Sequence, residues 1–218
     1  MADWLTWQIV DSAFPTGAFA HSLGLEAAWQ QGEVEDVGAL RRFMEATVRQ
    51  TASASVPLVN AAYRSPARLE ELDLLADAFL VNSVANRASR IQGRTLAATA
   101  ARIWPGTLAA GVPGRAADLC AHIAPLAGVV FRAIDLPHDV LVGVVLFSAA
   151  RGVASAAVRL GIVGGYEAQR LQFECIPMLE RMSRRCQDFT ESDLAQTEPI
   201  LDLLHAAHGR LYSRLFQS

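Results

Sequence analysis

Alanine and other strong helix formers fill most of this chain. Alanine alone supplies 38 of the 218 residues, and residues of this kind favour helix over strand. Proline and glycine interrupt the apolar pattern at intervals, as they do between helices. No segment alternates apolar and polar residues like a strand, and the apolar run 142–147 has helical flanks. The sequence therefore predicts an all-α fold, a single-domain bundle of about eight to ten helices.

Apolar spacing and capping residues predict where the helices lie. Ser65 followed by Pro66 predicts a helix start, and Thr190 with Asp193 forms a predicted capping box before the last helix. The most hydrophobic segment, 138–160, is apolar all round its first half and is predicted to be the central buried helix. The other predicted helices cover 4–10, 22–31, 36–56, 84–102, 113–131 and 166–187, and the last one ends near His208.

The charged residues exclude several classes of enzyme. All 19 basic residues are arginine, and the chain contains no lysine. P-loop NTPases and kinases need a lysine at their phosphates, and pyridoxal enzymes need one for the Schiff base. The net charge of −3 and the pI of about 5.9 also argue against a nucleic-acid partner.

The composition predicts a cytoplasmic protein without a membrane span. The longest strongly apolar run, 140–150, is shorter than the ~18–20 residues that cross a bilayer, and the first residues lack the regions of a signal peptide. The cysteines Cys120, Cys175 and Cys186 are too scattered for a disulfide framework, and we interpret them as small core residues on helical faces. Because 52% of the residues are hydrophobic, we expect apolar surface that faces partners.

One short motif predicts an alternative function. Residues 20–24 read A-H-S-L-G, which resembles the nucleophile elbow of some serine hydrolases, with Ser22 as the nucleophile. An elbow of this type needs a strand before the serine. The preceding segment holds Pro15 and Gly17 and has no strand pattern, so a hydrolase remains only the alternative hypothesis.

Histidines and arginines supply the other candidates. His205 and His208 lie three apart on the last predicted helix and are weak candidates for metal ligands, since two histidines make half a site. Arg87, Arg90 and Arg94 form an i, i+3, i+7 stripe. Such a stripe either grips carboxylates or phosphates, including those of a partner's nucleotide, or is a solvated helix face. The lone histidines are interpreted as structural: His122 and His138.

The N-terminal region resembles a known family. Residues 7–28 read W-Q-I-V-D-S-A-F-P-T-G-A-F-A-H-S-L-G-L-E-A-A, similar to the signature L/F-P-x-G-G-F-x-Y/H-S-x-G-L-E of the urease accessory protein F (UreF) family. Further similar segments follow in the family's order at 87–93, 122–128, 151–161 and 213–218. Ala18 departs from the second glycine of the signature, and His21 stands where many members have tyrosine.

The resemblance implies a function for the whole chain. It implies an all-α homodimer that acts as a non-enzymatic chaperone in urease maturation. Members bind accessory protein D (also called H) and, through that complex, the nickel-carrying GTPase G, and the assembly delivers nickel into apo-urease. The chain would hold no cofactor of its own, because the complex handles the nickel. The absence of lysine fits this assignment of the GTPase activity to a partner, because the P-loop then belongs to that partner.

Two segments are the predicted contacts with partners, and intramolecular packing is the alternative for each. We expect the tail 209–218, which follows a body of residues 1–208, to be mobile alone and ordered on a partner. Its predicted contact residues are Leu211, Tyr212, Arg214, Leu215 and Phe216. In the N-terminal motif the predicted contacts are Phe14, Pro15, Gly17, Phe19, His21, Ser22, Gly24 and Glu26. The arginine stripe at 87, 90 and 94 is the candidate surface for the GTPase.

Overall fold

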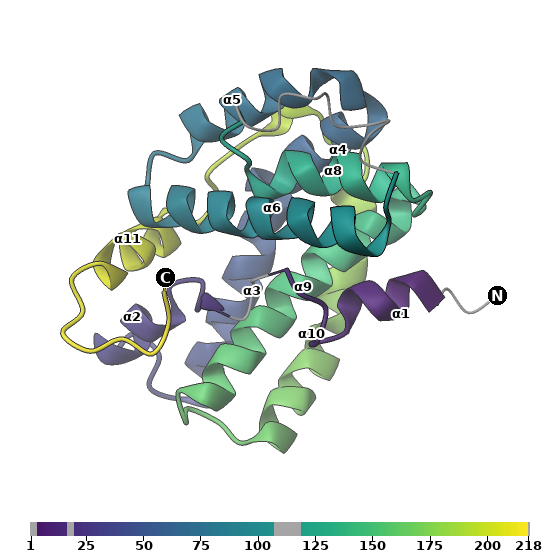
Figure 1. Ribbon diagram of the computed structural model, residues 1–218. Helices are drawn as coiled ribbons and strands as arrows, with labels where there is room; N and C mark the ends of the chain where they lie inside the picture. Colours follow the sequence, from purple (N-terminus) through teal and green to yellow (C-terminus); the bar gives the residue numbers. More distant parts are fainter. Residues whose placement is uncertain (1–3, 17–19, 107–118, 218) are drawn as a thin grey trace.

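A long apolar helix, α9 (His138–Arg159), runs through the centre of the protein in the computed structural model (Figure 1). The structure describes residues 4–16, 20–106 and 119–217. Leu141 and Val144 of α9 contribute to one apolar core, whereas Leu146 and Val153 contribute to the other. This arrangement confirms the prediction that segment 138–160 forms the central buried helix.

All regular elements in the described part of the chain are helical, which confirms the predicted all-α fold. Short 3-10 turns cover Pro66–Arg68 and Glu191–Asp193. The remaining α-helices are α1 (Trp4–Val10), α2 (Leu25–Gln30), α3 (Val37–Ala54), α4 (Val56–Arg64), α5 (Leu69–Phe79), α6 (Ser83–Ile103), α8 (Ile123–Ala133), α10 (Gly165–Cys186) and α11 (Pro199–His208).

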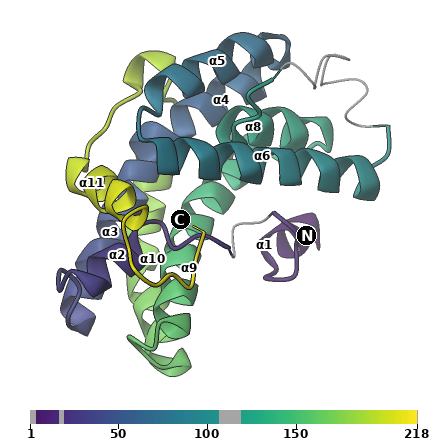
Figure 2. The same cartoon turned by 60° about the vertical axis from the view of Figure 1, so that its left-hand side comes forward.

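The helices form two groups that share α9. One group packs α3 and α10 along α9, and α2 lies beside them. The other group packs α4, α5 and α6 around α8 at the top of Figure 1. The turned view in Figure 2 shows α11 at the side of the molecule between the two groups, in contact with both α2 and α6. The C-terminal segment then returns toward the start of the chain.

Helix α9 is long and apolar enough to cross a membrane by length and composition alone. However, 56% of its most apolar stretch is buried inside the protein, where α3, α10 and α8 pack against it. The core helix of a bundle has the same composition, because it is apolar on every side that its neighbours cover. The packing accounts for the hydropathy of this helix.

Two predicted helix starts lie later in the chain than expected. The Thr190–Asp193 capping box is present, but it caps the 3-10 turn, and α11 begins only at Pro199. Pro66 likewise begins a 3-10 turn, and α5 follows at Leu69. In both places the cap residues mark a helical start correctly, and the first turn is too tight to continue as an α-helix.

Two other helices begin later than predicted, because residues with left-handed backbone conformation precede them. Leu23 and Gly24 have φ of 57° and 84°, so α2 begins at Leu25 rather than at residue 22. Ala121 has φ of 68°, so α8 begins at Ile123 and the predicted helix 113–131 is wrong for 119–122. Residues 113–118 of that prediction lie outside the described residues.

Candidate functional site

The N-terminal motif and the C-terminal tail meet at Glu26. This carboxylate lies on α2 and is 2% exposed. One of its oxygens accepts the backbone N–H of Leu215 at 2.6 Å, and the other accepts the N–H of Phe216 at 3.1 Å. His208 Nε2 lies 3.0 Å from the second oxygen. Three groups from the end of the chain are therefore held by one buried side chain near its start.

Further contacts attach the tail to the body. Gln217 donates its backbone N–H to the carbonyl of Ala20 at 2.8 Å, and Gln30 donates to the carbonyl of Ser213 at 3.1 Å. The ring of Phe216 is 5% exposed, and the guanidinium of Arg159 lies 4.1 Å from its centroid. Phe216 therefore packs within the molecule, which is the intramolecular alternative for this residue.

Other tail residues face solvent. Tyr212 is fully exposed and Leu215 is 54% exposed, and Arg214 also lies at the surface. Leu211 is half-buried. The backbone hydrogen bonds fix the path of the tail, so an aromatic ring, a cation and an apolar side chain are presented together. Their predicted role as partner contacts stays a prediction.

Most described residues of the N-terminal motif serve packing. Phe14 is buried, and its ring lies 5.8 Å from that of Trp104. The carbonyl of Pro15 accepts the hydroxyl of Thr99 at 2.8 Å. His21 is also buried. Gly17 and Phe19 lie outside the described residues. Phe14 and His21 therefore pack inside the molecule, which is the intramolecular alternative for these two residues.

Gly24 has a steric reason to be glycine. Its φ of 84° is strained for other residues, and a Cβ there would lie 3.2 Å from Cδ2 of His205. The glycine therefore lets α11 approach the start of α2. This contact places the two histidines of α11, His205 and His208, beside His21.

The structure contradicts the serine-hydrolase alternative. Ser22 is 0% exposed, whereas an elbow presents its hydroxyl to the substrate. No strand precedes it in the described residues 4–16 and 20–21. The A-H-S-L-G sequence is therefore a turn that leads into α2, and Ser22 is not placed to act as a nucleophile.

The motif and the tail also border one hollow. A cavity of about 480 Å³ is lined by Phe14, Pro15, His21 and Phe216 on one side. Its other side is the part of α9 that carries small residues, namely Ser148, Gly152 and Ser155. The two predicted contact segments therefore border the same region of the molecule, whereas the sequence analysis predicts two separate contacts.

Burial and mutual repulsion lower the pKa of two histidines of this region, His205 and His21. Burial, with a smaller contribution from His208 and His21, lowers the pKa of His205 to about 4. Burial and then His208 also lower the pKa of His21. His208 directs Nε2 at Glu26. The two weak metal-ligand candidates, His205 and His208, thus belong to the packing between α11 and α2.

We expect acid to destabilise this region. The pKa of His205 is about 4 in the folded protein against 6.5 for the free side chain. Between these values the unfolded chain binds a proton that the folded chain does not, so stability falls as the pH drops through this window. The expected loss is on the order of 1–3 kcal/mol. Urea unfolding as a function of pH measures it, and His205→Gln should make the dependence shallower. An unchanged slope in that variant contradicts the assignment.

The three arginines of the stripe on α6 differ in their contacts. Arg90 donates from Nε to the carbonyl of Cys120 at 3.2 Å and lies 3.9 Å from Asp77. Arg87 and Arg94 are exposed. Arg87 and Arg94 therefore lie at the surface, while Arg90 holds the segment before α8.

The remaining histidines and cysteines agree with their structural interpretation, with one exception. His138 Nε2 lies 2.8 Å from Asn60 Oδ1, and Cys175 and Cys186 are buried on α10. Burial raises the pKa of both thiols. Cys120, predicted to lie on a helix, instead lies in the irregular segment before α8, next to His122.

Sequence reasoning missed two aspartates of α5. Asp73 is 1% exposed and accepts the backbone N–H groups of Ala121 at 3.0 Å and His122 at 2.7 Å. Asp77 lies 3.1 Å from His122 Nε2. The only available signal was their i, i+4 spacing on a helix that also carries Glu70 and Glu71. That spacing is equally common on exposed helix faces.

Comparison with known proteins yields a consistent set of relatives. Residues 34–176 match the family model described as UreF. The chain is 35% identical to urease accessory protein F of Oryza sativa subsp. indica, over 98% of this chain and 84% of the relative. It is 34% identical to urease accessory protein F of Arabidopsis thaliana, over 99% and 92% of the two chains. Urease accessory protein UreF of Mycolicibacterium vanbaalenii is 32% identical over 95% of each chain.

Proposed function

The chain belongs to the UreF family of urease accessory proteins, and from this we propose that it is a non-enzymatic chaperone that joins two other accessory proteins. In this proposal it binds accessory protein D/H and, within that complex, the nickel-carrying GTPase G, and the assembly inserts nickel into apo-urease in the cytoplasm. Nickel is the cargo of the complex. The observation that carries the proposal is the match to urease accessory proteins over nearly the whole chain.

The exposed face of the tail supports a contact with accessory protein D/H. Tyr212 and Leu215 are large apolar side chains in solvent, and Arg214 lies between them. Aromatic residues and arginine are the side chains that most often dominate binding energy at interfaces. Glu26 and Phe216 hold this face in place, so a partner meets an ordered surface and loses less free energy to ordering it.

Two other surfaces support the remaining contacts. Arg87 and Arg94 are exposed and can face the GTPase, whereas Arg90 is held by the segment before α8. On α10, Tyr166 is 98% exposed and Phe173 is 72% exposed. They lie seven residues apart and so share one helix face, which suits a second copy of this chain in a homodimer.

Co-expression with accessory protein D/H and GTPase G tests this proposal. We expect the wild-type chain to capture both partners on an affinity resin. Tyr212→Ala with Leu215→Ala should weaken capture of D/H by about tenfold or more, while Phe216 and the fold stay intact. Arg87→Ala with Arg94→Ala should lose the GTPase and keep D/H.

Leu74→Ala on α5 is the matched control, because this side chain is also apolar and is 59% exposed. It should leave both captures unchanged. If the wild-type chain captures neither partner, the bridging function is wrong. If it captures both and the tail variant binds D/H like the wild type, the tail is not the contact.

A further inference from the structure

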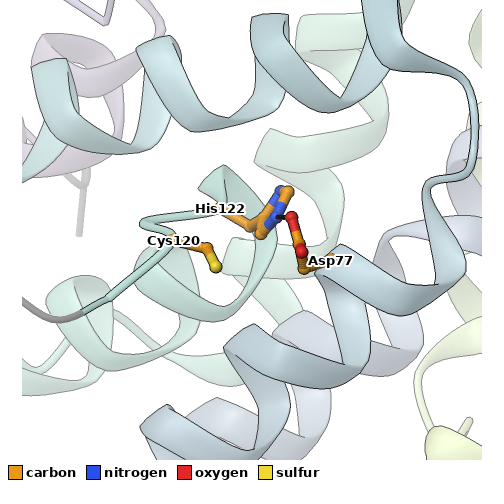
Figure 3. Close-up of side chains that lie close together, drawn as sticks. All are labelled: Asp77, Cys120 and His122. Atoms are coloured by element: carbon orange, nitrogen blue, oxygen red, sulfur yellow. Dashed lines mark hydrogen bonds and ion pairs between the residues drawn. The ribbon is translucent and has the colours of Figure 1, made fainter.

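Asp77, Cys120 and His122 bring three different metal-binding groups together, away from the surfaces described above. Figure 3 shows the side chains of Cys120 and His122, from the segment that leads into α8, next to Asp77 of α5. One ligand atom from each lies within 4.8 Å of the others. His122 Nε2 and Asp77 Oδ1 are 3.1 Å apart. Within the described part of the chain, no other histidine, cysteine and carboxylate groups converge in this way.

The backbone that carries Cys120 and His122 is held in an unusual conformation. Ala121 between them has φ of 68°, and the carboxylate of Asp73 accepts the N–H groups of both Ala121 and His122. A Cβ on Gly93 would lie only 2.0 Å from the carbonyl oxygen of Ala121, so α6 can approach this closely only with glycine there. Backbone strain persists where several contacts enforce it, and such places are often functional sites.

The second nitrogen of the imidazole also has a partner. His122 Nδ1 lies 3.1 Å from the hydroxyl of Ser89, and Nε2 is the nitrogen directed at Asp77. Histidine ligands of metals are oriented in the same way, by a hydrogen bond to the other ring nitrogen. On Asp77, Oδ1 accepts from Asn86 Nδ2 at 2.9 Å, which orients the carboxylate.

From this geometry we propose that Asp77, Cys120 and His122 bind one divalent transition-metal ion of the zinc, cobalt and nickel class. A thiolate, an imidazole and a carboxylate are the donors that such ions prefer, whereas magnesium and calcium prefer oxygen alone. Ligand atoms around tetrahedral zinc lie roughly 3.3–3.8 Å apart. The His122–Asp77 distance of 3.1 Å is already close to this range, and the distances to the Cys120 thiol, which are at most 4.8 Å, must shorten when an ion binds.

Charge and access both permit an ion here. The thiolate of Cys120 and the carboxylate of Asp77 neutralise a divalent cation, and the neighbouring charges of Asp73 and Arg90 offset each other. The side chain of Asp77 is 39% exposed and that of His122 is buried, so the ion enters from the Asp77 side. Three protein ligands leave one position for a water molecule or an incoming group.

This inference goes beyond the proposed function, in which the partners handle the nickel. It assigns a metal site to this chain itself, on α5 and the segment before α8. It replaces the sequence-based expectation that the chain holds no metal of its own. It also differs from the weak candidates His205 and His208, which lie in α11.

Titration of the full-length chain with Co²⁺ tests the site. We expect a thiolate-to-cobalt charge-transfer absorption that saturates at one Co²⁺ for each chain, and Zn²⁺ should abolish it by competition. The absorption requires a thiolate, so ions bound only by His205 and His208 do not produce it. Absence of this band at equimolar Co²⁺ overturns the proposal.

Single-residue variants locate the thiolate. Cys120→Ser should lose the band, and the matched control Cys175→Ser should keep it, since Cys175 is buried in a different core. A band that survives in Cys120→Ser overturns the assignment. Circular dichroism confirms that each variant folds. If Cys120→Ser does not fold, Asp77→Asn serves instead: it should weaken Co²⁺ binding at least tenfold, and unchanged affinity overturns the site.

Ser89→Ala tests the orientation of His122 and leaves all three ligands in place. Loss of such an outer partner typically weakens metal binding about 10–100-fold. We expect the band to persist in shape and to need more Co²⁺ for saturation. A purely structural role of Ser89 would lower the thermal stability of the metal-free chain and leave the affinity unchanged, and that result overturns the role of Ser89.

Discussion

Gly128→Ala should strongly destabilise this protein, although it adds only one methyl group inside a helix. A Cβ at this position of α8 would lie 2.5 Å from the carbonyl oxygen of Val59 and 2.8 Å from the backbone nitrogen of Tyr63. Both atoms belong to the backbone of α4, which cannot rotate away as a side chain can. The helices must separate, and we expect the free energy of unfolding to fall by about 3 kcal/mol, at the upper end for overpacked cores.

Gly143→Ala is the matched control, because Gly143 also lies inside a helix but a Cβ there meets nothing within 4 Å. Alanine is a better helix former than glycine, so we expect this variant to gain about 0.5–1 kcal/mol. Urea unfolding followed by circular dichroism measures both variants. Equal changes in the two variants would mean that helix propensity, and not the α4–α8 contact, decides the effect at Gly128.

Glu26→Gln should release the C-terminal tail without leaving a cavity. Glutamine has nearly the same shape, but it replaces one of the two acceptor oxygens of Glu26 with an NH₂ group, which is a donor. This NH₂ group would face the backbone N–H of Leu215 or Phe216, and two donors cannot form a hydrogen bond. The buried contact with His208 Nε2 is then made by a neutral amide in place of a carboxylate. Hydrogen bonds to charged groups contribute about 1.5–3 kcal/mol each. We expect a loss of about 3 kcal/mol in the free energy of unfolding.

Hydrogen exchange distinguishes this local effect from general unfolding. The amides of Leu215 and Phe216 should exchange much faster in Glu26→Gln, while those of α9 keep most of their protection. Glu33→Gln is the control, because Glu33 is an exposed glutamate just after α2 and should change stability by less than about 0.5 kcal/mol. Protection of Leu215 and Phe216 that is the same in both variants would show that Glu26 does not hold the tail.

The helices themselves could be predicted because their signals are local. The apolar stripe of a helix repeats every 3.6 residues, and its ends carry proline, glycine or capping side chains, so a short window contains the information. Helix α9 was predicted within one residue of its observed ends for this reason. The capping box at Thr190 was also predicted, although it begins a 3-10 turn.

The start of α8 shows where local signals fail. Segment 113–131 has the composition of a helix, yet the backbone at Ala121 is left-handed. Asp73, which lies 48 residues earlier, takes the N–H groups that would otherwise begin the helix. Gly93 makes room for the resulting bend. No window around Ala121 contains either residue.

The residues of the candidate site were partly recognised from the sequence, but their arrangement was not. The amino-acid sequence by itself determined the all-α class, the central position of α9 and the family, because each depends on residue types in a fixed order. Only the tertiary structure decided that Glu26 is a buried acceptor for Leu215, 189 residues away, and that Asp77 faces Cys120 and His122. In a sequence, an isolated glutamate or aspartate cannot be distinguished from a charged surface residue. Its burial becomes favourable only when hydrogen-bond donors from distant parts of the chain converge on it.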